Sequence, residues 1–292
     1  MKLLVLGKSG QVAQALLERG PDFPNVNVVA FGRPELDLEV PGSAAALIAR
    51  ENPDLVVNAA AYTAVDQAEG EAGRAFRING EAVAEVAAAT KRANAVLVHL
   101  STDYVFDGKS AVPYTEEAPT NPQSVYGRSK LAGEEAVRSC LDRHLIIRTS
   151  WVYSAGSRNF VRTMMALADE RDVIKVVDDQ RGCPTAASDL ADAVLRLGSS
   201  PLMTFGTFHL CGDGSTSWCG LARQVMFERE RLGLHAPKIE AITSADFPTP
   251  AQRPSNSSLD CGAFESACGF RLPPWQHSLR PVVERLARAH AI

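Results

Sequence analysis

Short apolar runs alternate with amphipathic, helix-forming stretches through the first half of the chain. The apolar runs are almost free of polar positions and cover residues 3–6, 26–31, 55–58, 96–100 and 145–147. Strands that are buried on both faces of a sheet have this composition. The stretches between them are rich in Ala, Leu, Glu and Arg and cover residues 11–19, 43–51, 82–92 and 129–138. Because parallel strands need long, right-handed crossover connections, the alternation predicts an α/β protein with a doubly wound parallel sheet.

The pattern changes after Trp151. A helical stretch, an extended run and a turn-rich segment follow each other over residues 159–170, 173–177 and 178–184. A further helix and an apolar strand, residues 189–197 and 207–211, are typical of a return to the sheet. The remaining residues contain more Pro and Trp and fewer strand signals. We therefore predict a Rossmann-type NAD(P)-binding domain over residues 1–152 and about 184–212, and a smaller substrate-binding lobe over about 153–183 and 213–292.

Composition and charge narrow the class of protein. The chain is 46% hydrophobic and 22% charged, which is ordinary for a soluble globular protein. Thirty Lys and Arg against 34 Asp and Glu provide no basic excess for neutralising a phosphate backbone, so we expect no nucleic-acid partner. The apolar run Leu3–Leu6 is too short for a signal peptide or a membrane span. These features predict a cytoplasmic protein with no membrane contact.

The cysteines and histidines do not have the spacing of metal ligands. The six cysteines form no C-x-x-C pair, and the six histidines form no H-x-x-x-H on one helical face. We expect reduced, mostly buried thiols and no metal site.

Two glycines stand between the first predicted strand and the first predicted helix. Glycine allows a sharp turn and a close approach to phosphate, and the free N–H groups at a helix start attract anions. The spacing is G-x-x-G-x-x-A, not G-x-G-x-x-G, so by itself the pattern leaves an ordinary strand-to-helix turn open. In this context it predicts a dinucleotide site at Gly7, Gly10, Gln11 and Val12.

Arg33 follows the second predicted strand, where a site selective for NAD usually carries an acidic residue for the ribose hydroxyls. An arginine there can instead pair with a 2′-phosphate. Arg33 therefore favours NADPH over NADH as the cofactor. The alternative is a solvated surface arginine without a ligand.

A candidate catalytic group combines a strand end with a helix face. The predicted strand 96–100 leads to Thr102 at the sheet edge where doubly wound folds bind ligands, and Tyr126 and Lys130 share one helical face. At an effective dielectric of about 20, an ammonium about 4 Å away favours a phenolate by roughly 4 kcal/mol, or about three pKa units. This spacing predicts Tyr126 as a proton donor, with Lys130 lowering its pKa and hydrogen-bonding the cofactor ribose, and Thr102 holding the reacting oxygen. The alternative is a partly buried tyrosine beside a solvated lysine, since Y-x-x-x-K also arises by chance.

Taken together, these motifs resemble the extended short-chain dehydrogenase/reductase family. The matching segments are residues 7–12, 58–66, 101–108, 126–134, 148–153, 179–185 and 253–257. Two positions differ from many relatives: Ala13 stands where they have glycine, and Ala15 stands where magnesium-paired members carry a carboxylate. We therefore expect no metal-bridged dimer, while a homodimer of another kind stays open.

The resemblance implies a reaction and a set of residues for it. Hydride would pass from the nicotinamide to the C4 ketone of dTDP-4-dehydro-6-deoxy-L-mannose, and the product would be dTDP-L-rhamnose. Thr102, Tyr126 and Lys130 would form the catalytic set, and Asp103 and Trp151 would lie near the sugar. The residues implied to line the cofactor are Asp37, Leu38, Ala61, Tyr62 and Thr63. Arg253 suits the substrate diphosphate because a guanidinium fork matches phosphate oxygens, although a surface arginine is an equal alternative.

The same residues also bear on other functions found among related proteins. A nucleotide-sugar dehydratase would have an Asp-Glu pair after the threonine, whereas here Asp103 is followed by Tyr104. An epimerase would need a second proton-transfer residue, for which we find no candidate. A non-catalytic regulatory subunit resembling the beta subunit of methionine adenosyltransferase, which binds a dinucleotide and a partner enzyme, stays open.

Overall fold

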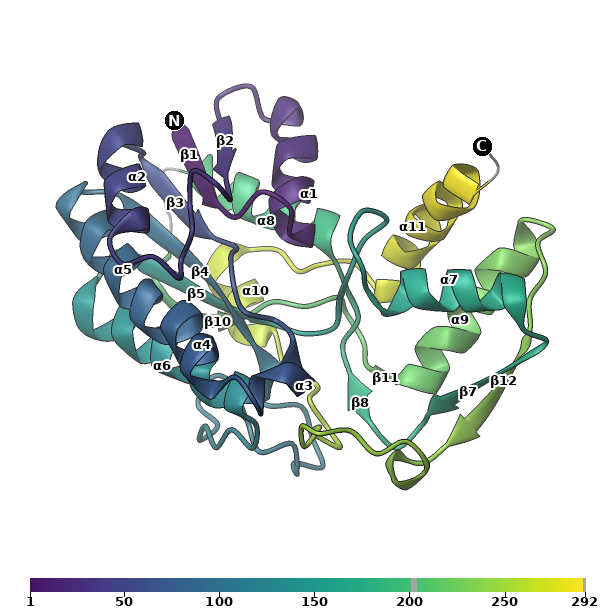
Figure 1. The fold of residues 1–292 in the computed structure, drawn as a ribbon. Helices are drawn as coiled ribbons and strands as arrows, with labels where there is room; N and C mark the ends of the chain where they lie inside the picture. The colour runs from purple at the N-terminus through teal and green to yellow at the C-terminus, as the bar shows by residue number, and fades with distance from the viewer. Residues whose placement is uncertain (201–203, 291–292) are drawn as a thin grey trace.

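A six-stranded parallel sheet forms the larger part of the molecule (Figure 1). The computed structural model describes residues 1–200 and 204–290. The strand order is β10-β5-β4-β3-β1-β2, and all five pairings are parallel. The strands are β1 Lys2–Leu6, β2 Asn27–Phe31, β3 Leu55–Asn58, β4 Val96–Thr102, β5 His144–Thr149 and β10 Gly206–His209. This arrangement confirms the predicted α/β fold with a doubly wound parallel sheet.

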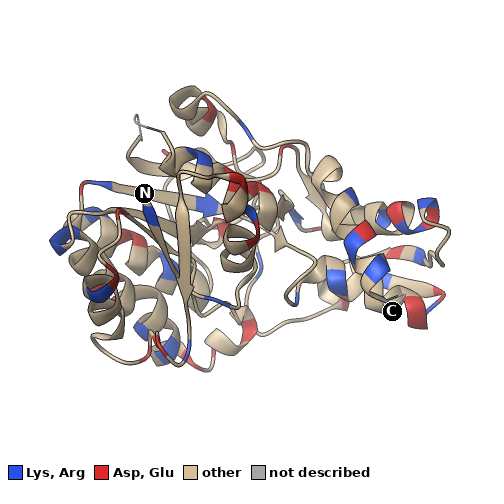
Figure 2. Cartoon of the chain, turned by 90° about the horizontal axis from the view of Figure 1, so that it is seen from above, with Lys and Arg blue, Asp and Glu red and all other residues tan. Residues whose placement is uncertain are grey.

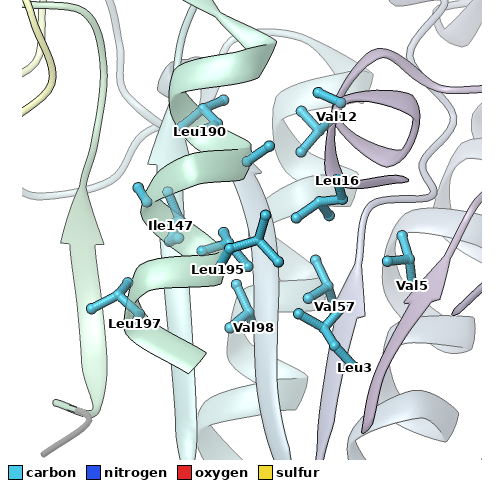
Figure 3. Packing of buried hydrophobic residues seen from close by; sticks show 14 of the residues in the cluster. Leu3, Val5, Val12, Leu16, Val57, Val98, Ile147, Leu190, Leu195 and Leu197 are labelled. Atoms are coloured by element: carbon cyan, nitrogen blue, oxygen red, sulfur yellow. The ribbon is translucent and has the colours of Figure 1, made fainter. Parts of the chain in front are cut away.

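Helices cover both faces of this sheet (Figure 1). Alternate residues of β1 point to opposite faces: Leu3 and Val5 join one buried cluster, and Leu4 and Leu6 join another. The first cluster lies beneath α1 Gln11–Arg19 and α8 Ala187–Gly198 (Figure 3). The helices over the second cluster are α2 Ser43–Glu51, α5 Ala82–Arg92 and α6 Val125–Cys140. Because both faces are buried, the strands are apolar at successive positions, which is the pattern seen in the sequence.

The smaller part of the molecule has a separate apolar core. A parallel pair, β7 Val173–Val177 and β12 Lys238–Ile242, packs with three helices (Figure 1). These helices are α7 Phe160–Glu170, α9 Trp218–Arg231 and α11 Trp275–His290. Two short pairs complete this side: β6 Val152–Tyr153 with β9 Thr185–Ala186, and β8 Arg181–Gly182 with β11 Thr216–Ser217.

Several elements differ from the predicted ones. Helix α6 begins at Val125, not at Ser129, because the Ser124 side chain caps it by accepting a hydrogen bond from Gly127 N. Helices α9 and α11 were not predicted. The remaining short elements, also unpredicted, are η1 Gly20–Asp22, α3 Val65–Ala68, α4 Ala72–Phe76, η2 Arg77–Glu81, η3 Asp103–Val105, η4 Ser244–Asp246 and α10 Gly262–Cys268. Isolated helices this short have little local signal, because helix nucleation is unfavourable without tertiary support.

The distribution of charged residues over the structure does not change the expectation that the protein has no nucleic-acid partner. Acidic and basic residues are interspersed along the helices of both parts (Figure 2). Within residues 1–200 and 204–290, no helix is long and apolar enough to cross a membrane. The cytoplasmic location, the absence of a nucleic-acid partner and the possible homodimer stay predictions. So do the domain limits, which include residues 201–203 and 291–292 outside the described part.

Candidate active site

A cleft of about 2000 Å³ lies at the carboxyl ends of the sheet strands and reaches onto the smaller part. Sites for drug-sized ligands occupy about 300–1,000 Å³, so this cleft has room for two ligands of nucleotide size. It includes the ends of β1 and β3, adjacent strands at which the order of the sheet reverses. The predicted site residues that line it are Gly7, Gly10, Gln11, Val12, Arg33, Asp37, Leu38, Ala61, Thr63, Thr102, Asp103, Tyr126, Lys130, Trp151 and Arg253.

The turn after β1 is shaped for a close backbone approach. Gly7 has φ +111°, and a side chain there would meet Ala60 N at 3.3 Å. Gly10 is the N-cap of α1 and brings no side chain to the helix start, and the first turn holds no acidic residue. The first N–H groups of a helix need partners, and a phosphate can supply them. The turn therefore fits the diphosphate of a dinucleotide.

The side chain of Gln11 connects the two parts of the molecule. Its Nε2 donates to Val152 O at 3.0 Å, and its Oε1 accepts from Ser154 Oγ at 3.0 Å and Asn159 Nδ2 at 3.1 Å. The amide is thus engaged by Val152 of β6 and by the segment that follows β6. Of the groups of Gln11, the backbone at the helix start is the one suited to an anion.

Arg33 lies at the edge of the cleft between two carboxylates. Its Nε donates to Asp37 Oδ2 at 2.9 Å, and its Nη2 donates to Glu39 Oε1 at 2.5 Å. Glu39 Oε1 also accepts from Arg74 Nη2 at 2.8 Å. The guanidinium is largely exposed, so a ligand can compete for it. The structure therefore allows contact with a 2′-phosphate while placing a negative charge beside it.

Tyr62 is the one predicted site residue that does not line the cleft. Its phenol donates to Glu71 Oε2 at 3.1 Å, and its backbone exchanges hydrogen bonds with the side chain of buried Asn79. Asn79 also donates to Ser129 Oγ at 3.0 Å. Tyr62 thus fixes the loop that presents Ala61 and Thr63, and its ring is directed elsewhere. Neighbouring positions in a loop can point opposite ways, which a motif match alone does not reveal.

Thr102, Tyr126 and Lys130 meet in this cleft from two elements. Thr102 ends β4, donates to Asp103 Oδ1 at 2.9 Å and accepts from Tyr104 N at 3.2 Å. Tyr126 is half-buried in the first turn of α6, edge-on to the Tyr104 ring at 5.6 Å between centroids. Lys130, one turn later, is buried, and its Nζ donates to Leu100 O at 2.6 Å.

The prediction that Lys130 lowers the pKa of Tyr126 was wrong. Burial raises the pKa of the Tyr126 phenol above its ordinary value, and the nearby Thr102 hydroxyl opposes this rise only in part. Burial also lowers the pKa of Lys130 to about 8, against the opposing charge of Glu134. Desolvation disfavours both charged forms, and the ammonium is held on the Leu100 carbonyl. Tyr126 is therefore protonated at neutral pH, which is the state that a proton donor needs.

Asp103 is a buried carboxyl group beside these residues. It is 3% exposed, and burial raises its pKa to about 6. Its Oδ1 accepts from Thr102, whereas Oδ2 has no hydrogen-bond partner among residues 1–200 and 204–290. Buried polar atoms are nearly always paired in folded proteins. Oδ2 is itself buried, and the Ser257 hydroxyl, like that of Thr102, favours the charged form of this carboxyl group.

Two tryptophans form the wall on the side of the smaller part. Trp151 has φ +48° and stacks on Trp218 with ring centroids 3.5 Å apart. Gly182 lies behind Trp151, where an added Cβ would meet the indole at 2.4 Å. Trp218 donates to Gln180 Oε1 at 3.2 Å. The sequence did not predict Trp218 as a site residue, because nothing in its local sequence separates it from a core residue.

Arg253 reaches the cleft from the loop after η4. Its Nη2 lies 2.7 Å from Asp66 Oδ2, and its Nη1 donates to Tyr104 Oη at 3.4 Å. The guanidinium is thus held by groups from the larger part and is partly exposed. This placement is compatible with its predicted contact with a diphosphate.

The six cysteines are free, and possible metal ligands do not cluster within residues 1–200 and 204–290. The structure carries all six cysteines as free thiols, with Cys183, Cys211 and Cys219 buried and the other three half-buried. Across residues 1–200 and 204–290, no cluster of His, Cys, Asp and Glu could hold a metal ion. Ala15 is buried in α1.

Comparisons with known proteins agree on one family. A family model described as the RmlD substrate binding domain matches residues 1–288. The curated dTDP-4-dehydrorhamnose reductase of Sinorhizobium fredii is 46% identical over 288 residues, which cover 97% of each chain.

Solved structures extend this agreement to the fold. A dTDP-4-dehydrorhamnose reductase of Clostridium acetobutylicum is 35% identical with a TM-score of 0.92, covering 98% of this chain and 100% of that one. One from Bacillus anthracis, solved in complex with NADP, is 31% identical with a TM-score of 0.90, covering 96% of this chain and 98% of that one. The predicted resemblance is confirmed: the chain belongs to the dTDP-4-dehydrorhamnose reductase family.

Proposed function

We propose that this protein reduces the C4 ketone of dTDP-4-dehydro-6-deoxy-L-mannose to give dTDP-L-rhamnose. It is an oxidoreductase that uses a nicotinamide dinucleotide. The observation that carries the proposal is the meeting of Thr102, Tyr126 and Lys130 with the Gly7 turn in one cleft. The larger part binds the cofactor, and the smaller part closes the site over the sugar nucleotide.

The cofactor, when bound, supplies the hydride. Its diphosphate is held by the backbone of the Gly7–Val12 turn, and Asp37, Leu38, Ala61 and Thr63 line the adjoining wall. Lys130 hydrogen-bonds the ribose. Arg33 pairs with a 2′-phosphate, which favours NADPH, although Asp37 and Glu39 compete for the same guanidinium.

Tyr126 donates the proton that the new alkoxide oxygen needs. Its raised pKa keeps the proton on the phenol until negative charge develops on the substrate. The Thr102 hydroxyl holds the same oxygen. We assign Lys130 to the cofactor ribose in this step, because burial, and not Lys130, governs the pKa of the phenol.

The rest of the cleft orients the substrate. Asp103 and Trp151 lie near the sugar, with the Trp151 ring packed against its face. Arg253 binds the diphosphate, since its fork remains partly exposed while Asp66 fixes its position.

The test is to incubate the purified protein with the keto-sugar nucleotide and either NADPH or NADH. We expect loss of reduced-nicotinamide absorbance together with formation of dTDP-L-rhamnose, identified by chromatography. No absorbance change at any protein concentration, with dinucleotide binding intact, would instead favour the non-catalytic regulatory subunit.

A further inference from the structure

Glu134 lies beneath the catalytic group on the same helix. It follows Tyr126 by eight residues and Lys130 by four, so the three side chains share one face of α6. Glu134 is 0% exposed. Its carboxylate accepts from Ser101 Oγ at 2.5 Å, from Arg148 Nε and Nη2 at 2.9 and 2.7 Å, and from Arg138 Nη1 at 3.0 Å.

These bonds join three elements below the cleft. Ser101 stands on β4 directly before Thr102, and Arg148 stands on β5 directly before Thr149. Ser101 and Arg148 are partners in the register of the two strands. One carboxylate therefore connects the ends of β4 and β5 to the helix that carries Tyr126 and Lys130.

A gain in folding stability does not by itself explain why a charged residue occupies this buried position. Replacing a buried ion pair by apolar residues of similar volume is often neutral or stabilising. What such a network provides is defined geometry, because each member restricts the orientation of the next. Here the geometry concerns Thr102 relative to Tyr126.

We propose that Glu134 is a positioning residue for the reduction: it fixes Ser101, and with it Thr102, against the face of α6 that bears Tyr126 and Lys130. This inference rests on the proposed function. Glu134 acts through Ser101 and Lys130 and has no place in the lining of the cleft.

The charge of Glu134 also acts on Lys130. Lys130 shares one face of α6 with Glu134 and Tyr126 and lies near His99 on β4, and the pKa of His99 lies well below its ordinary value, so that imidazole is neutral. Glu134 itself faces Arg148 on β5, Arg138 on α6 and His209 on β10. Glu134 opposes the lowering of the Lys130 pKa that burial causes. Without this charge, Lys130 loses its proton at lower pH.

Three variants test the proposal in the full-length protein. Ser101→Ala removes one bond and leaves the ion pairs intact, Glu134→Gln removes the charge, and Glu134→Asp keeps the charge on a shorter stem. We expect kcat to fall about ten- to a hundredfold in Ser101→Ala and Glu134→Gln, with KM for both substrates little changed. The basic limb of the kcat–pH profile shifts to lower pH in Glu134→Gln and stays near that of the wild type in Glu134→Asp.

Matched controls separate positioning from loss of stability. Glu228→Gln removes a buried carboxylate that pairs with Arg231 at 3.0 Å on α9, and Ser139→Ala removes a serine hydroxyl at the exposed end of α6. Both should keep the kcat and pH profile of the wild type.

Two results would overturn the proposal. One is a kcat of folded Ser101→Ala within about threefold of wild type. The other is an unshifted basic limb in folded Glu134→Gln. Should Glu134→Gln not fold, Ser101→Ala alone decides. An inactive wild type would reject the proposed function instead, so the two failures are distinguishable.

Discussion

The proposed cofactor edge and the proposed reaction end of the cleft contain the same kinds of charged groups in opposite surroundings. At the edge, Arg33, Asp37 and Glu39 form exposed ion pairs, and hydrogen bonds hold the pKa of Asp37 below its usual value. At the reaction end, burial raises the pKa of Asp103 to about 6 and lowers that of Lys130 to about 8. Pairing dominates where water is present, and desolvation dominates where it is excluded.

The difference indicates that exposed charged groups suit the binding of a charged ligand, whereas buried groups with shifted pKa values suit proton transfer. Exposed ion pairs contribute about 0–1 kcal/mol each, so a charged ligand can replace their partners at little cost. Buried groups with shifted pKa values change protonation near neutral pH, as proton transfer requires, and they lower the stability of the free protein. The following experiments test this contrast in order of expected effect.

Tyr126→Phe has the largest effect, because it removes the proposed proton donor. We expect kcat to fall by about 10²- to 10⁴-fold, the usual contribution of a positioned acid. The Kd for the dinucleotide, measured by fluorescence titration, should not change. Tyr114→Phe, which removes a phenol bonded to Asp107 outside the cleft, serves as the control and should keep its kcat. A Tyr126→Phe enzyme within about threefold of wild type contradicts this role.

Asp103→Asn tests the effect of burial on stability. The pKa of Asp103 is raised in the folded state, so the folded protein holds this proton more tightly than the unfolded chain does. The resulting stability is fully present below the unfolded pKa and is lost as pH rises through about 6. A shift from 3.8 to about 6 corresponds to about 3 kcal/mol. Asp103→Asn should therefore increase Tm relative to wild type more at pH near 8 than at pH near 4.

Asp37→Asn is the matched substitution at the cofactor edge. The pKa of Asp37 is lowered in the folded state, so its contribution is present above the unfolded pKa and is lost on acidification. We expect Tm to decrease slightly near pH 8 and to change little in acid. If the two variants shift Tm in the same direction with pH, the contrast between the two regions is wrong.

Gly182→Ala tests the wall behind Trp151. The added methyl group would lie 2.4 Å from Trp151 Cε2, so the indole must move. Overpacking costs about 1–3 kcal/mol, and we expect kcat/KM for the sugar nucleotide to fall about ten- to a hundredfold. Gly73→Ala in α4 is the control, since an added Cβ there meets nothing within 4 Å. An unchanged kcat/KM in Gly182→Ala would show that the position of Trp151 does not matter.

Arg33→Ala has the smallest expected effect, because the side chain is exposed. We expect the ratio of kcat/KM with NADPH to that with NADH to decrease about tenfold, through loss of a charge-assisted contact. Glu39→Gln should increase the same ratio, since it removes a carboxylate that competes for Arg33. Arg280→Ala, which alters an exposed pair with Glu284 on α11, should leave the ratio unchanged. A preference for NADPH that survives Arg33→Ala would exclude the role of Arg33.

The local hydrophobic pattern predicted most helices and strands of the larger part, but it did not predict two of the three helices of the smaller part. The observed bounds of α1, α2, α5 and β3 equal the predicted ones, because each lies on a buried sheet and shows a clear apolar period. Helix α9 buries Glu228 and Arg229 among its apolar residues, and α11 contains Pro281. Buried charges and an internal proline obscure helical periodicity, so both helices went unpredicted.

The sequence by itself determined which residues could act together. Tyr126 and Lys130 share a helix face wherever that helix lies, and Gly7 and Thr102 stand at the carboxyl ends of strands that meet at one sheet edge. Only the tertiary structure decided the raised pKa of Asp103, the contact of Lys130 with Leu100, the direction of Tyr62 and the stacking of Trp218 on Trp151. The physical reason is that periodicity arises from backbone geometry, whereas desolvation and side-chain orientation depend on neighbours that are distant in the chain.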